Sequence, residues 1–94
     1  MQTSATLKGV SATPVVERTF TRMVDQGRKV RRLCLLRADK VFVIWVQVAD
    51  AADPVTIELF RGGVRCWATM TAAVRWIEDK MPELAAIEVV LQPV

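Results

Sequence analysis

The sequence predicts an α+β domain, in which an antiparallel sheet of four to five strands is covered on one face by two helices. Three observations predict this class: two apolar stripes at helical spacing, two apolar runs joined by a short polar link, and a pair of glycines between two further apolar runs. In chain order we expect a helix, four strands, a second helix and a last strand.

The first helix is expected to begin just after Thr13, whose hydroxyl can cap it. Pro14 suits the first helical position, because the N–H that proline lacks would have no partner there. Gly27 is expected to end the helix. Between them lies an apolar stripe formed by Val16, Phe20, Met23 and Val24.

The residues before this helix show little periodicity. We expect residues 1–12 to form a flexible tail, or a weak edge strand around residues 7–10, and residues 13–94 to form a single domain. If residues 7–10 also pair with the sheet, the arrangement approaches a ferredoxin-like sandwich with an extra hairpin.

Two strands are predicted at residues 30–36 and 41–48, and the short link between them favours an antiparallel hairpin. Alternate side chains of a strand point to opposite faces of the sheet. In the second strand the core set is Phe42, Ile44, Val46 and Val48. The outer set is too apolar for open solvent, so either another layer or an interface must cover it: Val41, Val43, Trp45 and Gln47.

Gly62 and Gly63 predict a two-residue hairpin turn between strands at residues 55–60 and 64–68, because glycine tolerates the positive φ of such turns. If Arg61 lies opposite Val64, the core face carries Val55, Ile57, Leu59, Cys66 and Ala68. The other face then carries Glu58, Phe60, Arg65 and Trp67. A register slip of one residue would exchange the two faces.

The second helix is predicted to begin after Thr69, a capping residue, and to end at Pro82. Its apolar stripe consists of Met70, Ala73, Val74, Ile77 and Met81. In a last strand, Ile87, Val89 and Leu91 alternate with Glu88 and Gln92.

Basic residues are concentrated in the front half of the chain, which has a net charge of +3 overall. Residues 18–49 contain eight basic and two acidic side chains, whereas residues 50–94 contain four basic and seven acidic ones. This asymmetry indicates polyanion binding, but it is equally compatible with self-association or with solvation. The predicted nucleic-acid-binding residues are Arg28, Lys29, Arg31, Arg32 and Arg65. The alternative for the basic run is an edge strand protected by charge from aggregation.

Large aromatic side chains are expected on the outer face of the sheet: Trp45, Phe60 and Trp67. Such residues can stack on the bases of single-stranded nucleic acid, but on strands they more often pack in a core or an interface. We therefore predict that this face is a protein interface and that the chain forms a homodimer through it.

The residue types argue against catalysis. Without histidine, neither a zinc site nor activation of Cys34 or Cys66 as a nucleophile is expected, and both cysteines are expected to be free thiols. The sequence contains no phosphate-binding loop, and no two carboxylates have a spacing that would place them in a shared pocket. We expect a non-enzymatic protein with no cofactor and no metal.

Neither a membrane nor secretion is indicated by the sequence. No apolar run approaches the roughly 20 residues needed to cross a bilayer, so a membrane is not an expected partner. Residues 1–10 lack the apolar region of a secretory signal, so a cytoplasmic location is expected.

Three segments carry a resemblance to a known group of proteins: RGGVRCW at residues 61–67, AAVRWI at residues 72–77 and IEVVL at residues 87–91. Together they resemble the C-terminal half of small partition-accessory proteins that proteobacterial plasmids and integrative elements encode. The chain departs from that pattern at residues 70–71, where a Ser/Leu-Asp helix start is usual, and at residues 81–82, where a glycine stop is usual. The resemblance implies an accessory role in a mobile genetic element and assigns no binding residue.

Two functions follow as hypotheses. The first is an accessory protein that associates with nucleic acid through its basic strand. The alternative is a protein–protein interaction or self-assembling adaptor that uses the aromatic sheet face.

Overall fold

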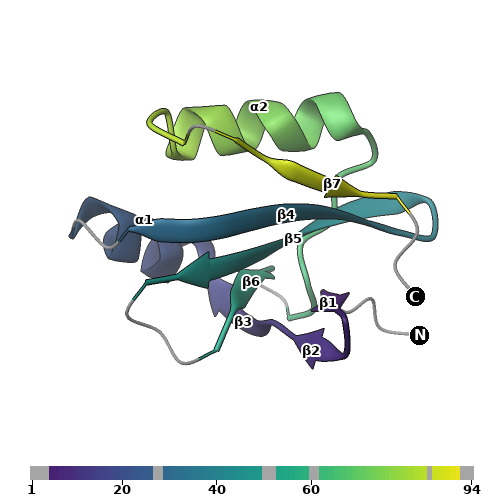
Figure 1. The fold of residues 1–94 in the computed structure, drawn as a ribbon, viewed down its shortest axis with the longest axis horizontal. Helices are drawn as coiled ribbons and strands as arrows, with labels where there is room; N and C mark the ends of the chain where they lie inside the picture. The colour runs from purple at the N-terminus through teal and green to yellow at the C-terminus, as the bar shows by residue number, and fades with distance from the viewer. Residues whose placement is uncertain (1–4, 27–28, 50–52, 60–61, 85, 92–94) are drawn as a thin grey trace.

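A computed structural model describes residues 5–26, 29–49, 53–59, 62–84 and 86–91 of the chain (Figure 1). The fold is α+β with two helices and a five-stranded sheet, as predicted. The order of elements differs from the prediction in two places. Three short strands precede the first helix, and the strand predicted at residues 64–68 forms only isolated bridges at Val64 and Trp67, so three strands and not four lie between the helices. The elements are β1 (Thr6–Leu7), β2 (Val10–Ser11), β3 (Thr13–Val16), α1 (Glu17–Asp25), β4 (Val30–Ala38), β5 (Val41–Val48), β6 (Val55–Glu58), α2 (Met70–Lys80) and β7 (Glu88–Val90).

The sheet is mixed, with the strand order β3-β6-β5-β4-β7. Its three central strands are antiparallel, as predicted, but each outer strand is parallel to its neighbour, β3 to β6 and β7 to β4. A parallel pair needs a long crossover connection. Here α1, β4 and β5 lie between β3 and its partner β6, and β5, β6 and α2 lie between β4 and its partner β7. The prediction of a wholly antiparallel sheet is therefore wrong at both edges.

The start of the predicted first helix is a strand. Thr13 donates its backbone N–H to the carbonyl of Pro54 at 2.8 Å, so the backbone nitrogen of Pro14 faces away from β6. Proline is tolerated on the open side of an edge strand, where it has no ladder bond to lose. The helix α1 therefore begins only at Glu17, and Val16 precedes it without a side-chain cap.

The main core lies between the sheet and both helices. Phe20 of α1 and Ala73 and Ile77 of α2 are buried in one cluster with side chains of β4, β5 and β6. The two helices therefore cover the same face of the sheet, as predicted. The predicted inward set of β5 also lies there, with Ile44, Val46 and Val48 buried and Phe42 packed against them.

A second, smaller layer covers the opposite face. The hairpin of β1 and β2 lies on the other side of the sheet from α2 (Figure 1), and it packs Ala5, Leu7 and Ala12 against β4 and β5. Trp45 donates its indole N–H to the carbonyl of Val10 at 3.1 Å. Residues 5–12, expected as a tail or a weak edge strand, thus form a two-stranded sheet of their own, and they bury the outer residues Val43 and Trp45 of β5.

The hairpin around the two glycines has a different register from the predicted one. Gly62 and Gly63 have positive φ, as the turn requires, but Glu58 pairs with Val64, three residues earlier than its expected partner Trp67. An odd shift exchanges the two faces. Trp67 pairs instead with Phe42 of β5 and enters the main core, while three residues expected in the core are exposed: Leu59, Cys66 and Ala68.

Candidate functional site

The five predicted phosphate-binding residues do not form one cluster. Lys29, which directly precedes β4, and Arg31, the second residue of β4, are both exposed. Arg32 and Arg65 take part in two separate intramolecular ion pairs. Arg28 lies outside the described residues.

Arg32 ties β4 to the edge strand β7. Its Nε and one terminal nitrogen each donate to a carboxylate oxygen of Glu88 at 2.8 Å, and its guanidinium carbon lies 5.9 Å from the ring centre of Trp45. The hydrogen bonds from Arg32 lower the pKa of Glu88, and the same contact raises the pKa of Arg32. Beside this pair, burial raises the pKa of the Cys34 thiol, so this cysteine is a poor nucleophile.

Arg65 is held between two indole rings. Its guanidinium carbon lies 5.0 Å from the ring centre of Trp67 and 5.5 Å from that of Trp76. One oxygen of Glu17 accepts from Arg65 at 2.6 Å and from the indole N–H of Trp76 at 2.9 Å. The hydrogen bond from Trp76 is the main cause of the lowered pKa of Glu17. The charge of Arg65 lowers this pKa further, while burial acts in the opposite direction. The cluster joins α1, α2 and the segment after the glycine turn.

Trp45 and Trp67, the two described residues of the predicted aromatic surface, do not lie on one surface. Trp45 and Trp67 are each only 7% exposed, and they belong to cores on opposite faces of the sheet. Phe60 lies outside the described residues.

Four exposed basic residues are carried by two elements at one end of the molecule, α1 and the beginning of β4. Arg18 and Arg22 stand one helical turn apart on α1, opposite the buried Phe20, and both are exposed. The beginning of β4, with Lys29 and Arg31, lies at the same end (Figure 1). Among the described residues, none of these four side chains is in an ion pair. Arg18 and Arg22 were not among the predicted binding residues, although their spacing opposite the apolar stripe could have identified them.

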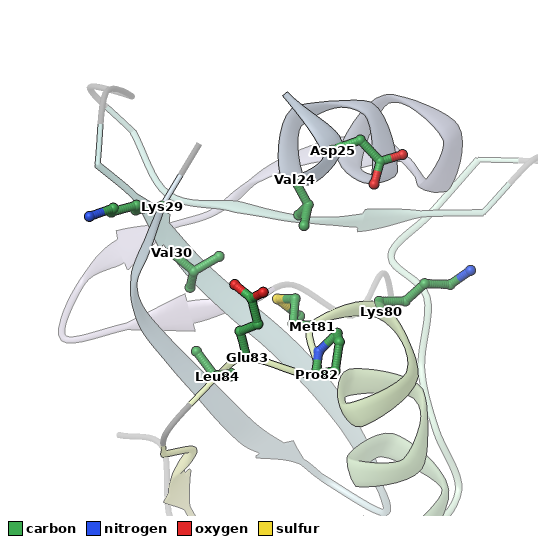
Figure 2. A pocket seen from close by; sticks show the side chains of 9 residues that line it. All are labelled: Val24, Asp25, Lys29, Val30, Lys80, Met81, Pro82, Glu83 and Leu84. Atoms are coloured by element: carbon green, nitrogen blue, oxygen red, sulfur yellow. The ribbon is translucent and has the colours of Figure 1, made fainter. Parts of the chain in front are cut away.

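An open hollow of about 530 Å³ lies where α1 ends, β4 begins and α2 ends (Figure 2). Apolar side chains form much of its lining: Val24, Val30, Met81, Pro82 and Leu84. Four charged residues surround them: Asp25, Lys29, Lys80 and Glu83.

A second hollow of about 370 Å³ adjoins the first and shares Met81, Pro82 and Leu84 with it. It continues toward Ile87, which precedes β7, and past Glu78 of α2. We call the two hollows together the α2-end groove. Pro82 was predicted as a helix stop, but nothing in the sequence pattern indicated that the residues after it line a concave surface.

No family model, curated protein or solved structure matches the chain. No helix in the described part of the chain is long and apolar enough to cross a membrane. Within the same residues, no group of three or more cysteine, aspartate or glutamate side chains is placed to hold a metal ion.

Proposed function

We propose that the protein is a small, non-enzymatic, cytoplasmic accessory protein that binds the phosphate backbone of nucleic acid. The observation that supports this most directly is the basic surface formed by Arg18, Arg22, Lys29 and Arg31. All four side chains are exposed, and no described acidic residue neutralises them. An origin in a mobile genetic element rests on the resemblance to partition-accessory proteins in residues 61–77 and 87–91 alone.

The proposal divides the basic residues by role. Arg32 and Arg65 stabilise the fold through Glu88 and Glu17, so they are removed from the binding set. Each remaining cation that neutralises a phosphate releases counterions, which makes the affinity fall with salt. Four contacts to duplex DNA correspond to a slope of about −3.6 for log affinity against log salt concentration.

The test is fluorescence anisotropy of labelled single- and double-stranded oligonucleotides across a salt series. The double variant Arg18→Glu, Arg22→Glu removes half of the basic surface, and the double variant Lys40→Glu, Arg75→Glu makes the same charge change at two exposed sites outside it as the matched control. We expect the first variant to bind more weakly with a shallower salt slope, and the control to stay closer to the wild type. Absence of binding at low salt, or equal losses in the two variants, would contradict the proposal.

A second candidate function, self-assembly, is favoured by the outer edge of β7. Among the described strands, β7 pairs only with β4, and next to its open edge Val89 and Leu91 are 43% and 46% exposed. The opposite edge of the sheet carries Pro14, which hinders pairing with another strand. Open edges of two copies can pair about a two-fold axis.

Sedimentation equilibrium of Leu91→Lys tests this second candidate, with Leu59→Lys as the control because Leu59 is also 46% exposed. If β7 edges pair, the wild type is a dimer, Leu91→Lys shifts it toward monomer, and Leu59→Lys does not. A wild-type monomer at high protein concentration, or a dimer unaffected by Leu91→Lys, would rule the edge out.

A further inference from the structure

The α2-end groove shares only Lys29 with the basic surface, and the functions above use none of its other lining residues. Its larger hollow, at about 530 Å³, is within the range of 300–1,000 Å³ that is usual for ligand sites. Met81 and Leu84 line both of its hollows, so an apolar surface continues from the end of α1 to the start of β7. Such a surface favours an occupant with apolar side chains.

The charged side chains around the groove point in different directions. Figure 2 shows the carboxylate of Glu83 above the middle of the hollow, while the ammonium groups of Lys29 and Lys80 extend outward on opposite sides. Within the described residues, neither Glu83 nor Asp25 is in an ion pair. The charge that an occupant would meet at the centre is therefore negative.

The helices add to this field. The last residues of both helices line the groove, Asp25 at the end of α1 and Lys80 at the end of α2. The carbonyl groups at a helix C-terminus carry a partial negative charge, which stabilises cations. Glu83 and two helix ends thus favour positive charge at the place where the lining favours apolar groups.

We propose that the α2-end groove binds a short segment of a partner protein in which basic and apolar side chains alternate. A lysine or arginine of that segment pairs with Glu83, and its apolar neighbours lie on Pro82 and Leu84. This proposal is independent of nucleic-acid binding, because it depends on a carboxylate and an apolar lining and not on Arg18 and Arg22.

The experiment measures binding of two short, end-capped, fluorescein-labelled peptides to the full chain by anisotropy, one of alternating leucine and lysine and one of alternating leucine and glutamate. The test variant is Glu83→Lys. The matched control is Asp79→Lys, which makes the same charge change at an exposed position of α2 that does not line the groove. Circular dichroism of each variant checks that the fold is retained.

We expect the wild type to bind the lysine peptide, Glu83→Lys to weaken that binding about tenfold or more, and Asp79→Lys to change it less than about threefold. Equal losses in both variants would show a general charge effect and overturn the proposal. So would a preference for the glutamate peptide, which would assign the groove to acidic ligands through Lys29 and Lys80. Absence of binding of the lysine peptide by the wild type would overturn it as well.

Discussion

Glu17 shows how one side chain supports several elements. One of its two carboxylate oxygens accepts from both Arg65 and Trp76, whose positions in the sequence are 48 and 59 residues away. Such distant partners leave no local pattern, so the sequence suggested that Arg65 was free to bind phosphate. The indole rings around Arg65 were likewise unpredictable, because they depend on the register of Trp67 and on the packing of α2.

The lowered pKa of Glu17 predicts a pH-dependent contribution to stability. A carboxyl group whose pKa is depressed by folding stabilises the protein above its unfolded pKa, near 4.5, and this contribution is lost as the pH falls through the folded pKa. Glu17→Gln should therefore lower the free energy of unfolding at pH 7 by no more than about 1 kcal/mol, since the pair is partly exposed. The difference between variant and wild type should shrink on acidification below pH 4.5.

Urea unfolding at several pH values measures this difference. Glu78→Gln is the control, because Glu78 is exposed on α2 and has no ion pair with a described residue. A difference for Glu17→Gln that stayed constant down to the acid limit of the fold would show that the ionised carboxylate does not contribute.

At the scale of elements, the hairpin around Gly62 and Gly63 shows the limit of pattern reading. The glycines predicted the turn and their positive φ correctly, but turns of two different lengths satisfy the same glycines. The longer turn places Trp67 beside Phe42, where a large side chain fills the core between β5 and α2. The gain from burying an indole therefore decided a register that the local sequence left undetermined.

Trp67→Ala should consequently lower the free energy of unfolding. Truncating a buried tryptophan removes its packing and leaves a cavity, at a cost of about 3 kcal/mol. Chemical denaturation followed by circular dichroism measures the cost. A variant with wild-type stability but an altered mass in solution would instead support the original prediction that Trp67 forms an interface.

The β1–β2 hairpin predicts a second effect at this scale. Leu7 packs against the outer face of the sheet and is 7% exposed, whereas Val10 of the same hairpin is 47% exposed. Leu7→Ala should lower the free energy of unfolding by about 2 kcal/mol, and Val10→Ala by less than about 0.5 kcal/mol. Equal and negligible effects would mean that residues 5–12 behave in solution as the tail that their composition indicated.

At the scale of the whole molecule, local patterns predicted the central part of the sheet and the apolar stripe of α2, but not the sheet edges. The predicted stripe of the first helix is right for Phe20, Met23 and Val24 and wrong for Val16, which belongs to β3 and is 40% exposed. The alternation within β5 was sufficient to identify its inward and outward sets. The parallel pairs β3–β6 and β4–β7 join strands that have one helix and two other strands between them in the sequence, and no short segment encodes such a pairing. The same distance hid the two ion pairs, each of which joins the front half of the chain to the back half.

The last prediction is that the adjacent residues Arg31 and Arg32 have different roles. Arg31 is exposed and in no ion pair with a described residue, whereas Arg32 holds β7 to β4 through Glu88. Arg31→Glu should weaken oligonucleotide binding and leave the melting temperature nearly unchanged. Arg32→Glu should lower the melting temperature, because it removes a two-point contact and sets two carboxylates side by side.

Thermal unfolding of both single variants, with anisotropy on the same samples, separates the two tasks. The double variant Arg32→Glu, Glu88→Arg restores opposite charges at the β4–β7 contact and should recover part of the lost melting temperature. If Arg32→Glu melted like the wild type and lost binding as Arg31→Glu does, Arg32 would rejoin the binding surface. The charge excess of residues 18–49 would then act as one polyanion site, and the division between binding and structural arginines would fail.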